Sequence, residues 1–289
     1  MSEFKYIKIK TSKSDEFKSS LEDEDKVSGV IEVQLNRPEL HNAFNEEFIS
    51  ELTDCFRTLS ENPDVRLLVL SAAGKSFCAG ADLNWMKSMK DYSDEENYQD
   101  SVKLSQLFST LNDCPFPVIA KVNGATLGGG TGLVSACDFV VASEDAIFGF
   151  TEVGLGLVPA VISPYVINKI GESSARAYFL SGERFKAAEA LRLQLIHSVV
   201  PPSELDKALE KQVERFLRAG PQAAREAKGL IKGVFKRTPH SENLRDYTCK
   251  TIARVRTTEE GQEGMAALLE KRKPKWFPVK ENAAQGESK

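Results

Sequence analysis

Two glycine-rich stretches, Phe77–Asp82 (FCAGAD) and Asn123–Gly132 (NGATLGGGTG), decide how this chain is interpreted. Each follows an apolar run of strand length and precedes a segment of helical character. Small residues at such a junction let a ligand approach the free backbone amides at the start of a helix. Each stretch alone is equally compatible with a purely structural turn, because glycine-rich turns are common. Together they indicate a site built from backbone amides, although the spacing does not show that the two turns meet.

Several other kinds of site are excluded because the sequence lacks the motifs that they require. The stretches lack the Gly-Lys-Ser/Thr ending of a phosphate-binding loop and the glycine spacing of a dinucleotide site, and the chain has no GxSxG nucleophile motif. The five cysteines are widely spaced without a CxxC pair and are interpreted as reduced core thiols, and the three histidines lie far apart. What remains is a pair of amide-presenting turns, the arrangement that stabilises the oxyanion of a thioester enolate.

The composition is that of an ordinary globular protein. The chain has 289 residues, of which 41% are hydrophobic and 28% charged, and a net charge of -4 with the two signs interspersed. No basic field is present that would hold nucleic acid or an anionic membrane, so neither is expected as a partner. The sequence shows neither a signal or transit pattern nor an apolar run of membrane-spanning length, and the cytoplasm is the expected compartment.

Strands and helices are expected to alternate on both sides of the two stretches as far as about residue 150. Alternating or apolar runs predict strands near residues 4–10, 30–36, 65–72, 115–124, 138–143 and 146–150, and a helix follows Asn45. Beyond Pro164 the pattern predicts helices only, near residues 172–180, 186–193, 204–218, 223–236, 244–254 and 259–271. We therefore expect an α/β core over residues 1–200 with a mobile loop near 11–28, a helical region over 201–278, and a disordered tail over 279–289.

Six segments resemble, in order, the enoyl-CoA hydratase/isomerase (crotonase) family. They are NRPELHNAF (36–44), FCAGADL (77–83), NGATLGGG (123–130), CDFVVAS (137–143), FGFTEVGLGLVPA (148–160) and EGMAALLEKRKPKW (263–276), and the likeness spans nearly the whole chain. It implies an α/β spiral of β-β-α units with a C-terminal α-helical trimerisation region, assembled as a homotrimer or as a hexamer (a dimer of trimers). It also implies an acyl-CoA thioester substrate, no separate cofactor, and an oxyanion hole formed by the amides of Ala81 and Gly129.

The catalytic carboxylates depart from the two-glutamate pattern of hydratases in this family. The position of the first glutamate is Gly132, whereas the second is Glu152, whose apolar neighbours are expected to raise its pKa. One glutamate suffices for a Δ3,Δ2-enoyl-CoA isomerase, which only moves a proton between two carbons. CAGADLNWMK, GGGTGL and EVGLGLVPAVISPYVINKIG nevertheless resemble bacterial methylglutaconyl-CoA or carboxygeranoyl-CoA hydratases of leucine and terpenoid catabolism. A hydratase with Glu152 in both proton transfers is therefore favoured, and the isomerase is the alternative.

The remaining site residues are implied by the same likeness. Substrate contacts are expected at the two turns and at the residues that follow them, namely Ala79, Ala81, Asp82, Leu83, Asn84, Gly129, Thr131 and Gly132. The Asp82 side chain is interpreted as a helix cap, so that its backbone is the site element. Trp85 and Met86 are interpreted as packing residues rather than as pocket lining, and the basic run over 271–275 as a solvated end that in related enzymes approaches the CoA phosphates. A different class, a CoA- or RNA-binding pseudoenzyme, also stays open, because one catalytic glutamate is missing.

Overall fold

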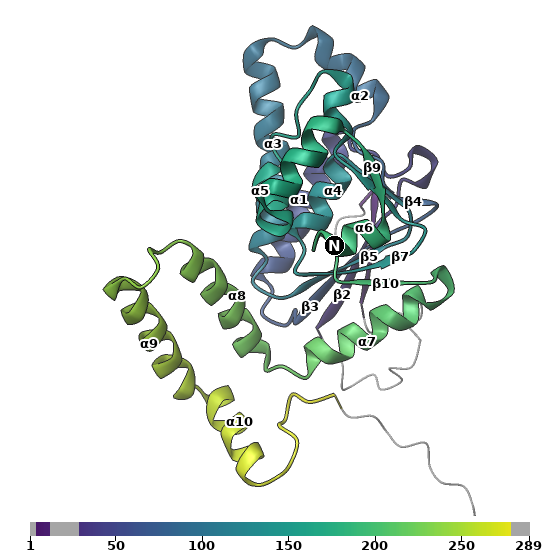
Figure 1. Cartoon of the computed structure of the whole chain (residues 1–289). Coiled ribbons are helices and arrows are strands. Elements are labelled where there is room, and N and C mark those ends of the chain that lie inside the picture. Colours follow the sequence, from purple (N-terminus) through teal and green to yellow (C-terminus); the bar gives the residue numbers. More distant parts are fainter. Residues whose placement is uncertain (1–3, 12–28, 279–289) are drawn as a thin grey trace, which may run out of the picture.

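Two sheets built from consecutive strand pairs form the α/β part of the protein. The structure, a computed structural model shown in Figure 1, describes residues 4–11 and 29–278. The expected mobile loop and the expected disordered tail lie, but for residue 11, outside the described residues. The larger sheet has the order β1 (Ile7–Thr11), β2 (Val30–Leu35), β3 (Leu67–Ala72), β5 (Val118–Val122), β7 (Phe139–Ser143) and β10 (Ser198–Val200). Only β1 runs antiparallel to its neighbour.

The smaller sheet has four strands, and three of them directly follow strands of the larger sheet along the chain. Its order is β4 (Ser76–Cys78), β6 (Ala125–Leu127), β8 (Ile147–Gly149) and β9 (Arg184–Lys186), with β4, β6 and β8 parallel and β9 antiparallel to β8. Because β4, β6 and β8 each follow a strand of the larger sheet and precede a helix, the chain winds as successive β-β-α units. This confirms the expected spiral.

The prediction that only helices follow Pro164 is wrong. β9 and β10 are short strands that pair with β8 and β7, which lie 37 and 57 residues earlier in the chain, respectively. Three-residue strands are too short to produce a periodic pattern, so their partners rather than their sequence determine them. The helix predicted near residues 172–180 is the second part of α5 (Ser163–Ser181), which follows the kink at Gly171, where φ is 72°.

Helices cover both faces of the larger sheet. α1 (Glu46–Glu61), α3 (Asp94–Asp113), α4 (Gly129–Ala136) and α5 contribute buried residues to the main core, together with α6 (Ala187–Arg192). α7 (Leu205–Leu217) lies across the other face, where Leu205, Leu209 and Val213 follow helical spacing and pack in one cluster with strand residues. α2 (Leu83–Ser88) follows β4, and short 3-10 helices span Pro38–Leu40, Met89–Asp91, Thr151–Leu155 and Pro202–Glu204.

The last helices form an arm that extends from the core. In Figure 1, α8 (Pro221–Phe235) leaves the sheet after α7, α9 (Glu242–Arg256) turns back beside it, and α10 (Glu259–Leu269) continues beyond α9. Polar side chains of α8 attach the arm: Arg225 donates to the carbonyl of Val65 (2.6 Å), and Lys228 Nζ lies 2.6 Å from Asp138 Oδ2. The arm leaves large apolar side chains exposed, namely Ile231, Phe235, Ile252, Met265, Leu268 and Leu269.

Among the described residues, no helix combines the length and the apolar character needed to cross a bilayer. All five cysteines are unbridged, and four of them are buried, as expected of reduced core thiols. Cys249 is exposed, so its interpretation as a core thiol is wrong. Burial raises the pKa of the Cys78 and Cys137 thiols to about 12, which makes both unreactive at neutral pH.

Candidate active site

The first glycine-rich turn leaves the amide of Ala81 free of backbone pairing. Gly80 has a positive φ of 98°, which turns the chain out of β4. In the parallel bridge that follows, Phe44 N–H donates to the carbonyl of Gly80 (2.7 Å), and Asp82 N–H donates to the carbonyl of Phe44 (2.8 Å). These two bonds involve Gly80 and Asp82, the residues on either side of Ala81, and not the amide of Ala81 itself. Ala81 is exposed. The turn thus offers one backbone N–H donor, that of Ala81, at the protein surface.

The second turn presents the amides at the start of α4. Gly128, with a φ of 51°, precedes the helix, and Gly129 is its first residue. The first amides of a helix have no partner within the helix, and the helix dipole adds a partial positive charge to them. A side chain cannot be added at Gly129 freely, because its Cβ would lie 2.7 Å from Phe44 Cε2. Glycine is therefore required here for Phe44 to pack against the start of α4.

The structure brings the two turns together, which their spacing in the sequence did not show. β4 pairs with β6, with Ser76 opposite Ala125 and Cys78 opposite Thr126, so that both turns leave the same edge of the smaller sheet. A Cβ at Gly130 would lie 2.3 Å from the carbonyl oxygen of Cys78. Close contact between the backbones of the two turns thus depends on this glycine. Ala81 and Gly129 consequently follow neighbouring strands.

Glu152 lies beside the second turn. It belongs to the 3-10 helix Thr151–Leu155, and its Oε1 would be 3.2 Å from a Cβ placed on Gly128. Its Oε2 is buried without a hydrogen-bond partner among the described residues. Burial raises the pKa of the Glu152 carboxyl, and its own backbone N–H opposes this only in part. A desolvated carboxyl group with a free oxygen is suited to exchanging protons with a ligand.

Gly132 has no space for the missing glutamate. A Cβ at this position would lie 2.3 Å from Ile162 Cγ2 and 2.9 Å from Phe108 Cε1. Both of these side chains are buried. The departure from the two-glutamate pattern is thus built into the packing around α4.

Asp82 caps α2, as the sequence predicts. Its Oδ1 accepts hydrogen bonds from Asn84 N–H (2.7 Å) and Trp85 N–H (3.4 Å), and its Oδ2 lies 2.8 Å from Arg37 Nη2. Burial alone would raise the pKa of Asp82, but the two amides and Arg37 outweigh it and hold the pKa below its usual value. The side chain therefore supports the turn from within and is 5% exposed.

The other expected contacts differ in what they offer a ligand. Leu83 and Asn84 are exposed after the cap, whereas the amide of Ala79 already donates to the carbonyl of His41 (3.0 Å). The Thr131 hydroxyl is fully buried and donates to the carbonyl of Thr126 (2.7 Å), so it fixes the turn, and only its backbone remains for binding. Trp85 is buried, which agrees with its interpretation as a packing residue.

Arg37 and Asn42 are supporting residues that the sequence interpretation missed. Asn42 is fully buried, accepts a bond from Arg37 N–H and donates to the carbonyls of Ala73 (2.9 Å) and Ser76 (2.8 Å). Arg37 Nη1 donates to the carbonyl of Ala43 (2.8 Å). These bonds join the NRPELHNAF segment to both ends of the β3–β4 connection. The available signals were an arginine between a strand and Pro38, and an asparagine in the turn that follows this proline.

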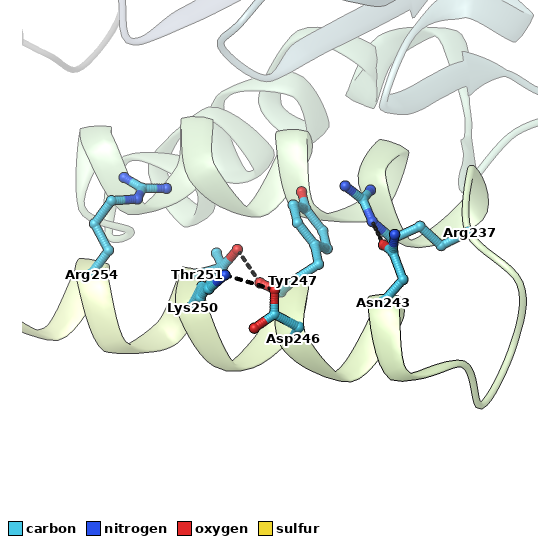
Figure 2. Close-up of a pocket in the computed structure, with 7 residues that line it drawn as sticks. All are labelled: Arg237, Asn243, Asp246, Tyr247, Lys250, Thr251 and Arg254. Carbon is cyan, nitrogen blue, oxygen red and sulfur yellow. Dashed lines mark hydrogen bonds and ion pairs between the residues drawn. The ribbon is translucent and has the colours of Figure 1, made fainter.

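A cavity of about 540 Å³ lies on the arm, away from the two turns (Figures 1 and 2). Its lining is polar and comes from α9 and the loop that follows α8: Arg237, Asn243, Asp246, Tyr247, Lys250, Thr251 and Arg254. The charged groups are already satisfied, because Arg237 Nε donates to Asn243 Oδ1 (3.0 Å) and Lys250 Nζ lies 2.8 Å from Asp246 Oδ2. Arg254 pairs with Glu226. We therefore interpret these contacts as structural.

The basic run at the end of α10 is also largely engaged in internal contacts. Arg272 pairs with Glu263 (2.6 Å) and Glu270 (2.6 Å), and Lys273 Nζ lies 4.8 Å from the centre of the Phe277 ring. In the described part of the chain, no three His, Cys, Asp or Glu side chains cluster so as to hold a metal ion.

Two amide-presenting turns beside a desolvated carboxyl group define an enzyme that stabilises an oxyanion while it moves a proton. The family model for enoyl-CoA hydratase/isomerase matches residues 25–278. The chain belongs to this enoyl-CoA hydratase/isomerase (crotonase) family.

Individual relatives share both the sequence and the fold. The crystal structure of an enoyl-CoA hydratase from Shewanella pealeana is 42% identical with a TM-score of 0.82, covering 86% of this chain and 92% of that one. A crotonyl-CoA hydratase of Syntrophomonas wolfei is 32% identical, over 88% of this chain and 95% of the relative. A peroxisomal Delta(3,5)-Delta(2,4)-dienoyl-CoA isomerase of Arabidopsis thaliana is also 32% identical, over 86% of this chain and 93% of the relative.

Proposed function

We propose that the protein is an enoyl-CoA hydratase, which adds water across the α,β double bond of an enoyl-CoA. The observation that carries this proposal is the free, buried Oε2 of Glu152 beside the turn that presents the Gly129 amide. The amides of Ala81 and Gly129 would donate hydrogen bonds to the thioester oxygen and stabilise it as the negative charge of the enolate develops. The names of the hydratases among the relatives support the same reaction.

In this reaction one carboxyl group serves twice. The Glu152 carboxylate takes a proton from water while the water oxygen bonds to the β-carbon, and the electrons of the double bond move to the thioester oxygen. The protonated Glu152 then returns that proton to the α-carbon, and the thioester carbonyl re-forms. A carboxyl group whose pKa is raised by burial is suited to both steps, since it gains and loses a proton nearer to neutral pH.

A Δ3,Δ2-enoyl-CoA isomerase is the second candidate, and a specific observation favours it. The space that a carboxylate at position 132 would need is filled by Ile162 and Phe108, which leaves Glu152 as the acid–base group beside the turns. Isomerisation needs only one group that removes a proton from one carbon and returns it to another. An isomerase also occurs among the relatives.

The substrate that we propose carries a branched or carboxylated acyl group. An example is 3-methylglutaconyl-CoA, an intermediate of leucine degradation. This finer proposal rests on the segments 78–87, 128–133 and 152–171, which resemble hydratases for such substrates. Action in the cytoplasm without a separate cofactor stays a prediction.

A spectrophotometric panel of acyl-CoAs tests these proposals. Purified protein is mixed with crotonyl-CoA, 3-methylglutaconyl-CoA and a 3-enoyl-CoA, and the absorbance of the conjugated enoyl thioester is followed. A hydratase removes this absorbance from the first two, whereas an isomerase creates it from the third. Glu152→Gln should lower the rate of either reaction by about 10²-fold or more. The exposed Glu183→Gln is the matched control and should leave the rate unchanged.

Retained activity in Glu152→Gln would remove the catalytic assignment. If no acyl-CoA is turned over, a titration with RNA at several salt concentrations tests the binding-protein alternative, for which affinity should fall steeply with salt.

We also infer that the arm mediates assembly into a homotrimer or a dimer of trimers. Support comes from the apolar side chains that the arm leaves exposed, above all Phe235, which is 88% exposed, and Leu269, which is 83% exposed. Analytical ultracentrifugation of the wild type and of Phe235→Asp measures the assembly. A wild-type monomer, or an unchanged mass in the variant, would contradict this inference.

A further inference from the structure

The packing around Gly132 separates this site from one with two carboxylates. Gly132 lies three residues after Gly129 in α4, so both positions are on the same face of the helix. Phe108 approaches both, since its Cζ lies 3.8 Å from a Cβ placed on Gly129 and 3.0 Å from one placed on Gly132. Ile162 approaches Gly132 most closely, at 2.3 Å from the added Cβ. A side chain at position 132 therefore needs two neighbours to move.

The two neighbours differ in how firmly they are held. Phe108 is fully buried between the rings of Phe44 and Tyr165, whose centres lie 6.4 Å and 6.2 Å from its own. Ile162 precedes α5, and its carbonyl accepts hydrogen bonds from Tyr165 N–H (3.1 Å) and Val166 N–H (3.1 Å). Its backbone is thus fixed by the start of α5, whereas its side chain ends against Gly132. Truncation of Ile162 removes the obstruction without altering the hydrogen bonds of α5.

We propose that Ile162 is a specificity-determining residue, which keeps the site to a single carboxylate by filling the space over Gly132 with its Cγ2 branch. The proposal rests on the proposed acyl-CoA chemistry. It concerns the ratio of hydration to isomerisation at this site. With Glu152 as the carboxyl group beside the turns, proton transfer between two carbons needs nothing more, but hydration requires the same group to activate water. A carboxyl group at position 132 would help to activate water and would raise the ratio of hydration to isomerisation.

The steric part is tested by thermal unfolding, which does not depend on activity. Gly132→Ala is made in the wild type, in Ile162→Ala and in Ile170→Ala. Ile170 lies within α5, the helix that Ile162 precedes, and is also buried, so Ile170→Ala is a matched control for the lost apolar volume. We expect Gly132→Ala to lower the melting temperature by on the order of 5 °C in the wild type and in Ile170→Ala. In Ile162→Ala we expect at most half of that loss, because the Phe108 ring still requires a shift of a few tenths of an ångström.

The chemical part is tested with Gly132→Glu in the same three backgrounds. The ratio of hydration to isomerisation is measured with one straight-chain 2-enoyl-CoA and its 3-enoyl isomer. Gly132→Glu/Ile162→Ala should raise this ratio at least tenfold over Ile162→Ala, whereas Gly132→Glu in the wild type and in Ile170→Ala should fold poorly or lose both activities.

An equal loss of melting temperature in Ile162→Ala and Ile170→Ala would overturn the assignment of Ile162. A well-folded Gly132→Glu/Ile162→Ala protein with an unchanged ratio would overturn its role in dividing the reaction. If the wild type turns over no enoyl-CoA, the proposed function is the part that fails. The thermal comparison then still decides whether Ile162 excludes a side chain at position 132.

Discussion

Arg37 Nη2 lies 2.8 Å from Asp82 Oδ2, and the two side chains are only 9% and 5% exposed. This buried ion pair joins the end of β2 to the residue that follows Ala81 and caps α2. Asp82 N–H is at the same time bound to the carbonyl of Phe44, so the peptide after Ala81 is held by its backbone and by its side chain. The free amide of Ala81 therefore owes its fixed position to Phe44 and Arg37, which lie 37 and 44 positions earlier in the chain.

Removing one partner of this pair should cost much more than removing both. Arg37→Met leaves a buried carboxylate without its partner, and we expect it to lower the free energy of unfolding by about 3–5 kcal/mol. The double variant Arg37→Met/Asp82→Asn should lose less, because no unpaired charge remains and the amide oxygen still caps α2. Urea unfolding of the two single variants and the double variant measures the difference. Equal losses in Arg37→Met and in the double variant would show that the ion pair does not act as a unit.

Glu152 should make the protein less stable as the pH rises. Its pKa in the folded protein is raised from an ordinary value of 4.5, so the folded state holds this proton to a higher pH than the unfolded state does. The stability that protonated Glu152 contributes is present below pH 4.5 and is lost as the pH rises through the folded pKa. Glu152→Gln should therefore be more stable than the wild type at pH 7, with the difference vanishing below about pH 4. Melting temperatures of both proteins between pH 4 and 8 test this, and a constant difference over that range would contradict it.

Gly130→Ala should separate the two turns. The added Cβ meets the backbone carbonyl of Cys78 at 2.3 Å, and backbone cannot rotate aside as a side chain can. We expect a loss of about 1–3 kcal/mol in stability and a fall in kcat, because the amides of Ala81 and Gly129 no longer face one site. Gly229→Ala in α8 meets nothing within 4 Å and is the matched control. It should keep full activity and gain up to about 1 kcal/mol from helix propensity.

The arm should loosen when Lys228 loses its charge. Its Nζ donates to Asp138 Oδ2 (2.6 Å) and to the carbonyl of Phe116 (3.1 Å), which attaches α8 to the loops before β5 and β7. In Lys228→Met we expect faster amide hydrogen exchange throughout α8–α10, with little change in the sheets. Lys250→Met, which removes an exposed ion pair within α9, should leave exchange in α8 unchanged. Unaltered exchange in Lys228→Met would show that other contacts hold the arm.

Much of the fold could be predicted because local pattern and final environment agree in most elements. The apolar run after Val65 becomes β3, which is buried along its whole length, and the spacing after Asn45 becomes α1 with Asn45 as its cap. The short strands β9 and β10 could not be predicted, since pairing with distant strands rather than local preference forms them. The first part of α5 was also not predicted, because the kink at Gly171 interrupts the helix. Its helical character depends on packing against α4.

By itself, the sequence determined that two glycine-rich turns would present amides, that a carboxyl group at Glu152 would lie among apolar residues, and that position 132 lacks a second one. The tertiary structure alone decided that the turns meet, because their contact depends on the pairing of β4 with β6. It also decided that the absence of an acid at position 132 is enforced, since Ile162 and Phe108 reach Gly132 from two different helical segments. Glycines show where close approach is allowed, but only the folded chain shows what approaches them.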